Sequence, residues 1–164
     1  MTTRYVKRSF LNIEELKHLV IAIECEDFNE IREVEKEIKP FLKKIPTVSF
    51  VIFLNIDKVE DLSYVPSTSS IILFKEDMVR KITPKLEVIN RIDALDPDVF
   101  INLNRKPSAV IDFLSAISQA KMRVGFEEKK ELTELMLAVP NESGFKLFFE
   151  KLIHFMGQIN TKAA

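Results

Sequence analysis

The chain has 164 residues, enough for one well-packed domain and too few for two. Apolar residues make up 46% and charged residues 30%, an ordinary globular composition. The net charge of -1 argues against nucleic acid or an anionic membrane recruited by bulk electrostatics. We therefore expect one domain, residues 1–164, that binds no nucleic acid.

The sequence pattern contains no membrane, disulfide or targeting feature. The longest apolar runs span around five to eight residues, below the ~20 needed to cross a bilayer, so no membrane span is expected. The one cysteine, Cys25, forms no internal disulfide, which favours a reducing compartment. Residues 1–8 are polar and basic, and the apolar stretch 19–23 is too short for a secretory signal. We expect a cytoplasmic protein.

The first half of the chain combines apolar runs with one amphipathic segment. Residues 19–24 (LVIAIE) are continuous and rich in β-branched side chains, which is typical of a strand buried on both faces. A helix is predicted next, with Asp27 as its N-cap and Pro46 after its end. Further strands are predicted at 48–54 (VSFVIFL) and 70–74 (SIILF), joined by a polar connection.

The second half continues the alternation of helices and strands. Apolar residues spaced three apart predict a helix that ends before Pro97, with its stripe formed by Leu86, Ile89, Ile92 and Leu95. A strand at 99–103 precedes a second helix, in whose first turn Pro107 is expected. Strands at 122–125 and 134–139 follow.

A strongly amphipathic helix closes the chain after residues 141–143. One side of it carries Phe145, Phe148, Phe149, Leu152, Met156 and Ile159. Strands that alternate with helices in this way form βαβ units with right-handed crossovers. The sequence therefore predicts an α/β fold: a three-layer α/β/α Rossmann-like domain with a mostly parallel sheet of five or six strands.

Polar side chains follow the first and fourth predicted strands. In open α/β sheets, ligands bind outside the carboxyl ends of the strands. Glu24 and Asp27 lie at or just after the end of the first strand, and Asn102, Asn104 and Arg105 lie at or just after the end of the fourth. We take these five residues as candidates for binding a small ligand. The alternative is that they only solvate the chain where it leaves the core.

Glycine is scarce, with only Gly125, Gly144 and Gly157 in the chain. A phosphate cradle needs backbone amides that a ligand approaches without meeting a Cβ atom, as in a dinucleotide-binding turn or a P-loop. None of the predicted strand-to-helix turns contains a glycine. The sequence therefore argues against a dinucleotide-binding or P-loop enzyme, and no cofactor is predicted.

Other reactive side chains have ordinary explanations. Glu26 and Asp57 could join the carboxylates above around a divalent cation, but carboxylates near a helix N-terminus are favoured anyway. Cys25 lies among acidic residues, which raise a thiol pKa. His18 and His154 lack the spacing of a metal site. No metal centre is predicted.

The region 86–126 resembles part of a known enzyme family. Residues 98–104 (DVFINLN), 113–118 (FLSAIS) and 120–126 (AKMRVGF) resemble consecutive strand, helix and strand motifs. These motifs belong to the N-terminal Rossmann-like domain of heptosyltransferase-type glycosyltransferases, which have the GT-B fold. The arrangement also resembles a family of small bacterial proteins of uncharacterised function that keep only this domain.

The resemblance implies a domain that lacks the main donor-binding half. The transferases use a Gly-Asp pair after the first strand, whose acidic residue is the expected base, and they bind the nucleotide sugar mainly through a second domain. Here Glu26 and Asp27 occupy that place without the glycine, and Asp27 is the position onto which the base maps. No residues correspond to the second domain, so an isolated transferase activity is not expected.

We expect a non-catalytic binding or interaction module related to half of a glycosyltransferase. Its partner would be a small ligand at the strand ends, an unknown protein or a second copy in a homodimer. One alternative is an enzyme, glycosyltransferase-like or a hydrolase, that uses the acidic residues after the first strand and is completed by a partner. Another is a homo-oligomeric scaffold that assembles through the terminal helix.

Overall fold

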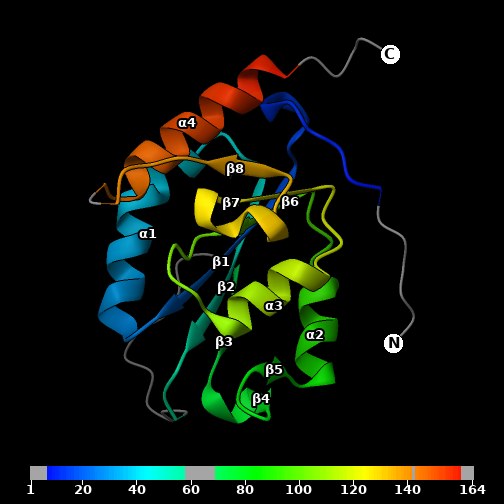
Figure 1. Cartoon of the computed structure of the whole chain (residues 1–164), viewed down its shortest axis with the longest axis vertical. Helices are drawn as coiled ribbons and strands as arrows, with labels where there is room; N and C mark the ends of the chain where they lie inside the picture. Colours follow the sequence, from blue (N-terminus) through cyan, green and yellow to red (C-terminus); the bar gives the residue numbers. More distant parts are fainter. Residues whose placement is uncertain (1–6, 58–68, 142, 160–164) are drawn as a thin grey trace.

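A computed structural model describes residues 7–57, 69–141 and 143–159, and its centre is a six-stranded, wholly parallel sheet (Figure 1). The strands lie in the order β3-β2-β1-β6-β7-β8. This is the 3-2-1-4-5-6 order of the Rossmann fold. The strands are β1 (His18–Cys25), β2 (Thr47–Leu54), β3 (Ser69–Leu73), β6 (Val99–Asn102), β7 (Met122–Phe126) and β8 (Leu135–Leu137).

Helices cover both faces of the sheet. On one face α1 (Phe28–Leu42) and α4 (Phe145–Gln158) lie side by side, and on the other lie α2 (Leu86–Asp93) and α3 (Ala109–Ile117) (Figure 1). Successive residues of β1 alternate between the two faces and are buried on each. Burial on both faces explains the continuous apolar runs in the sequence. The predicted three-layer α/β/α fold is confirmed.

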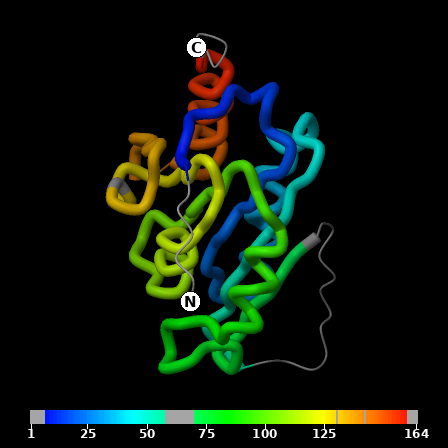
Figure 2. The backbone as a smooth tube through the Cα atoms, turned by 90° about the vertical axis from the view of Figure 1, so that its right-hand side faces the viewer, coloured from blue at the N-terminus to red at the C-terminus, as the bar shows by residue number. Residues whose placement is uncertain are grey.

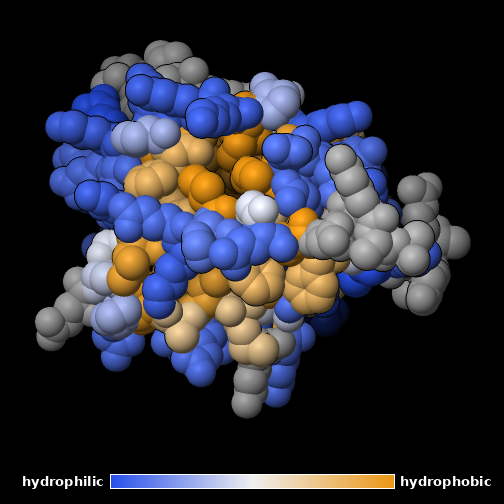
Figure 3. Space-filling model, turned by 90° about the horizontal axis from the view of Figure 1, so that it is seen from above, coloured by the Kyte–Doolittle hydropathy of each residue, from blue (hydrophilic) through white to orange (hydrophobic). Residues whose placement is uncertain are grey.

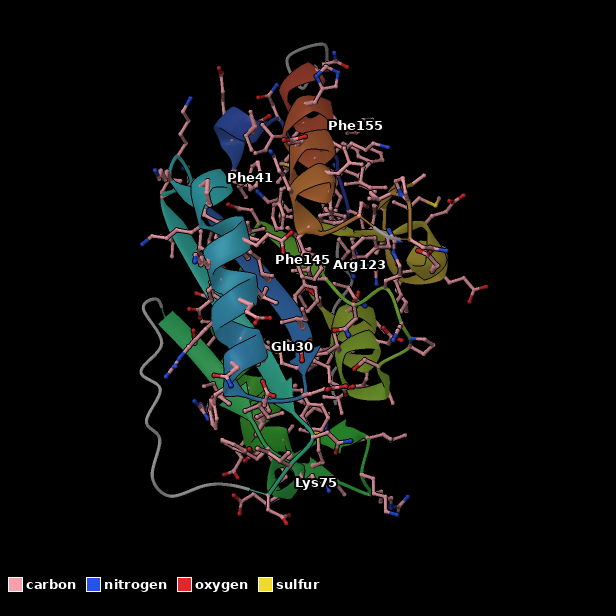
Figure 4. All side chains as sticks on the ribbon, turned by 90° about the vertical axis from the view of Figure 1, so that its left-hand side faces the viewer. Glu30, Phe41, Lys75, Arg123, Phe145 and Phe155 are labelled. Carbon is pink, nitrogen blue, oxygen red and sulfur yellow. The ribbon has the colours of Figure 1, made fainter. Side chains whose placement is uncertain are left out.

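The helix starts have identifiable caps. The Asp27 carboxylate accepts a hydrogen bond from Glu30 N at 2.8 Å, so Asp27 caps α1 as predicted. Gly144 precedes α4 and offers no side chain, and Glu37 of α1 instead accepts a hydrogen bond from Phe145 N at 2.7 Å. Figure 4 shows Phe145 at this junction between α4 and α1.

Two details of the predicted helices are wrong. Pro107 lies before the N-cap of α3 rather than in its first turn, because the Ser108 hydroxyl accepts from Ile111 N and caps the helix. Leu86 is 63% exposed and does not join the buried stripe of α2, where Val88 is buried instead. The predicted stripe members Ile89 and Ile92 are buried, so this one difference leaves the helix prediction itself intact.

Several short elements have no counterpart in the prediction. β4 (Met78–Val79) and β5 (Thr83–Pro84) form an antiparallel hairpin between β3 and α2. Short 3₁₀ helices occur at η1 (Ile13–Glu15), η2 (Lys75–Asp77) and η3 (Glu127–Leu132). Most of the predicted polar connection before β3, residues 58–68, lies outside the described residues.

The apolar stripe of α4 is part of the core. Phe148, Phe149, Leu152 and Met156 are buried, Phe148 packs on Phe126 of β7, and Phe149 stacks on Phe41 of α1. A second copy could not dock on this stripe without displacing the sheet. Phe155 is 41% exposed and lies at 6.4 Å, centroid to centroid, from the exposed Phe10. Apolar surface is visible in the middle of the face seen from above (Figure 3).

None of the helices in the described part of the chain has the length and apolar character needed to cross a membrane.

Candidate functional site

The sheet reverses direction of winding between β1 and β6. The chain leaves β1 towards α1 on one face and leaves β6 towards α3 on the opposite face. The two connections therefore diverge, and in this type of fold the region outside the carboxyl ends of such strands, here called the crevice, is where ligands bind. Three of the five predicted site residues, Glu24, Asn102 and Asn104, meet at this crevice.

Hydrogen bonds join these three residues to one another and to the start of α3. The Asn104 side-chain oxygen accepts from Glu24 N at 2.7 Å, and the Asn102 side-chain oxygen accepts from Asn104 N at 3.1 Å. The Ser108 hydroxyl donates to Glu24 Oε1 at 3.2 Å. The polar groups of the crevice therefore satisfy each other across the β1–β6 junction.

A buried ion pair lies behind this contact. Lys129 Nζ donates to the two carboxylate oxygens of Asp112 at 2.8 and 3.0 Å, and to the Lys106 carbonyl at 3.0 Å. The Lys129 side chain is only 5% exposed. Asn102 Nδ2 also donates to Asp112 Oδ1 at 2.9 Å. Because a buried charge is tolerated only when it is paired and hydrogen-bonded, these contacts explain how Lys129 occupies the interior.

We call the set Glu24, Asn102, Asn104, Ser108, Asp112 and Lys129 the crevice network. Ser108, Asp112 and Lys129 were not predicted. Asp112 gave a weak signal, because it interrupts an apolar helical run, AVIDFLSAI. Lys129 gave none, because a lysine within EEKKEL has the pattern of a solvated segment.

Burial governs the acid–base properties at the end of β1. It raises the pKa of the Glu24 carboxyl, an effect opposed by the Ser108 hydrogen bond and reinforced by the charges of Asp112 and Glu30. Burial and the neighbouring carboxylates, chiefly Glu30, raise the pKa of the Cys25 thiol to about 12. Cys25 is therefore a neutral, buried thiol at physiological pH.

The two other predicted site residues make their contacts elsewhere. Asp27 is exposed and caps α1. Arg105 donates to the Val139 carbonyl at 2.6 Å and to Asn141 Oδ1 at 2.9 Å, and its guanidinium carbon lies 4.6 Å from the centroid of the Phe126 ring. Arg105 thus holds the segment after β8 against the sheet. Its suggested role in ligand binding stays a prediction, as does that of Asp27.

No metal-binding cluster is found in the parts of the chain that the structure describes: no group of three or more His, Cys, Asp or Glu side chains could hold an ion. Glu26 lies just before the N-cap of α1, and its backbone amide donates to Glu30 Oε2 at 2.6 Å. Asp57, the other residue considered for a cation, is exposed.

A hollow of about 970 Å³ lies away from the crevice, between α2 and α3. Ile89 and Ile117 line its sides and Phe100 contributes to its lining from β6. It extends to residues 94–97 and 116–119, which lead into the amino ends of β6 and β7. The hollow is therefore not an entrance to the crevice network.

A family model matches residues 1–159. The chain belongs to the DUF6913 family. That family is described as one of unknown function. Searches of curated proteins and of solved structures gave no match.

Proposed function

We propose that this domain is a non-catalytic binding or interaction module, related to one half of a GT-B glycosyltransferase. The observation that carries the proposal is the closed crevice network. Ser108, Asn102 and Lys129 are 3%, 0% and 5% exposed, and each is bonded to another member of the network. A catalytic acid or base must reach a substrate within hydrogen-bond distance. Glu24 and Asp112 are partly exposed, but Glu24 Oε1 already accepts from Ser108 and both Asp112 oxygens accept from Lys129.

The turn after β1 further supports a role without nucleotide chemistry. Backbone amides cradle a phosphate only where no Cβ atom blocks the approach, and Glu26 and Asp27 stand in this turn. Their carboxylates, together with Glu30 in the first turn of α1, also oppose an anionic ligand. The relation to glycosyltransferases is supported by the strand order and by the location of the similar motifs on β6, α3 and β7.

One observation favours the alternative, an enzyme that uses the acidic residues after β1. The raised pKa of Glu24, in contact with the Ser108 hydroxyl, is the kind of perturbation found at active sites. In such an enzyme Glu24 would act as the acid or base, and a partner would have to open the crevice network.

A thermal-shift screen against nucleotides, nucleotide sugars and divalent cations tests the proposal. A ligand at a hundred times its dissociation constant adds about 2.7 kcal/mol, which raises the melting temperature by roughly 5–10 °C for a domain of this size. We expect no compound to raise it by more than about 1 °C.

The variants Asn104→Ala and Lys36→Ala make the screen specific. Asn104 belongs to the crevice network, whereas Lys36 is exposed on α1. A nucleotide sugar that stabilises the native chain and the Lys36→Ala variant, but not the Asn104→Ala variant, would falsify the non-catalytic proposal and support the enzyme.

A further inference from the structure

The β4–β5 hairpin and the first residue of α2 carry three exposed aliphatic side chains. Val79, Ile82 and Leu86 are 46%, 53% and 63% exposed. They account for half of the large apolar side chains that are exposed within the described residues, the others being Phe10, Met136 and Phe155. Solvated aliphatic side chains grouped in this way mark interaction sites. We call residues 79–86 the hairpin surface.

The hairpin is held firmly at its base and extends away from the sheet. Met78 pairs with Pro84, and both are buried. Lys85 N donates to the Asp77 carbonyl at 2.9 Å, and the Asp77 carboxylate accepts from Phe74 N at 2.8 Å. Figures 1 and 2 show the hairpin at one end of the molecule, and Figure 4 places Lys75 at the same end. A protruding shape fits a concave partner.

The tip of the hairpin is strained and cationic. Arg80 and Lys81 have φ values of 54° and 72°, in the left-handed region that favours glycine or asparagine. Both side chains are exposed, as is Lys85. Two consecutive cations therefore stand where glycine would relieve the strain. Strained backbone of this kind clusters at functional surfaces.

We propose that the hairpin surface docks into an apolar groove of another protein, and that acidic side chains border that groove. The inference rests on the proposed function as an interaction module. Residues 79–86 contain three cations and no carboxylate, so an acidic border complements them. Because the whole chain carries a charge of -1, an acidic partner is attracted to this end rather than to the molecule at large.

The same charges disfavour two other occupants. In a symmetric dimer formed through this tip, Arg80 and Lys81 would face their own copies and repel them. A uniformly anionic membrane would meet the exposed carboxylates of Glu76 and Glu87, which flank the hairpin surface. A protein partner can place charges of either sign opposite the cations and the flanking carboxylates, and apolar side chains opposite the exposed aliphatic ones.

Photo-crosslinking in the native cells tests the proposal directly. A photoreactive aryl-ketone residue is placed at Ile82 of the full chain and, as a control, at the exposed Lys36 of α1. We expect one protein to dominate the adducts at position 82 and to be missing at position 36. Peptide sequencing of the adduct should locate the contact next to aspartate or glutamate residues that border apolar ones.

Binding of the purified partner then distinguishes recognition from a structural role. The double variant Arg80→Asn with Lys81→Asn retains left-handed turn chemistry and should keep the fold, yet bind at least about tenfold more weakly, a loss that diminishes at high salt. Ile82→Ser should also weaken binding, whereas Lys36→Asn should not.

The proposal is overturned by equal adducts at positions 82 and 36, by adducts with a second copy or with lipid, or by a contact site without carboxylates. Failure here is separable from failure of the proposed function. Stabilisation by a nucleotide sugar contradicts the non-catalytic module, whereas a silent ligand screen with no specific adduct removes only the hairpin proposal.

Discussion

Glu24 and Cys25 are neighbours in the chain, but β1 directs them to opposite sides of the sheet. Cys25 is 2% exposed in the core beneath α1 and α4, while Glu24 is partly exposed beside Ser108. A single strand therefore carries two neighbouring titratable side chains, of which one is buried and the other is partly exposed to solvent. This difference leads to separate predictions for the thiol and the carboxyl.

Cys25 is expected to resist an aromatic disulfide reagent in the folded protein. With a pKa of about 12, roughly one thiol in ten thousand is ionised at pH 8, and burial excludes the reagent as well. Absorbance of the released thiolate should show no reaction in buffer and one equivalent in guanidinium chloride. Reaction of the folded protein at the rate of a free thiol would contradict this account.

The Glu24 carboxyl predicts a dependence of stability on pH. Its pKa is raised in the folded state, so its favourable contribution is present below the unfolded pKa of about 4.3 and is lost as the pH rises through the folded value. Glu24→Gln keeps an oxygen for the Ser108 hydroxyl without the charge. The variant should match or exceed the wild type in stability at pH 7 and lose that advantage at pH 4.

Urea unfolding at the two pH values measures this difference. Because Glu24 is partly exposed, solvent screening should keep the effect below about 1 kcal/mol. A glutamine variant that is clearly less stable at pH 7 than at pH 4, relative to the wild type, would show that the carboxylate is favoured by the fold.

Among the elements, the crevice network joins β1 to three later ones: β6, α3 and η3. The Lys129–Asp112 pair is the contact that brings η3 to the first turn of α3. An exposed pair on α4, Lys146 with Glu150, offers a comparison, because its side chains are 74% and 48% exposed. The two pairs allow the contributions of a buried and an exposed ion pair to stability to be compared in one protein.

Asp112→Ala should lower the free energy of unfolding by about 2–4 kcal/mol, because it leaves the buried Lys129 ammonium without its counter-charge. Glu150→Ala should change it by less than about 0.5 kcal/mol. Chemical denaturation of both variants provides the measurement. If Asp112→Ala and Asp112→Ala with Lys129→Met were equally destabilised, the cost would not come from an unpaired lysine.

The β4–β5 hairpin gives a prediction of the opposite sign. Lys81→Gly places the residue best suited to a positive φ at the strained tip, so the free energy of unfolding should rise by up to about 1 kcal/mol. Thermal denaturation of this variant and of Lys36→Gly, which puts glycine inside α1, should move the midpoint in opposite directions. A lower midpoint for Lys81→Gly would mean that the lysine side chain stabilises the hairpin.

For the whole molecule, the fold could be predicted because strands buried on both faces leave continuous apolar runs, as in 19–24 and 48–54. The neighbour of each strand could not be predicted, since periodicity carries no information on which edges meet. The hairpin was not predicted because strands of two residues are too short to show a period. Its turn positions also carry Arg80 and Lys81 in place of the glycine or asparagine that usually indicates a hairpin turn.

Of the candidate site, only the residues at the ends of strands could be predicted. Glu24 and Asn102 lie at the carboxyl ends of β1 and β6, and Asn104 lies two residues after β6, so their meeting follows from a parallel sheet. Lys129 enters from η3, and its buried ammonium is paired with Asp112 and hydrogen-bonded to the Lys106 carbonyl. The positions of Ser108, Asp112 and Lys129 in the network depend on tertiary packing, which no local sequence pattern encodes.

The central position of β1 has a consequence for synthesis on the ribosome. One edge of β1 is completed by β2 soon after translation, but Leu19 pairs on its other edge with Val99, about 80 residues later. Until that partner emerges, the nascent chain presents an apolar strand with unpaired amides and carbonyls, a template for aggregation. We expect the newborn polypeptide to depend on shielding of this edge until β6 has been synthesised.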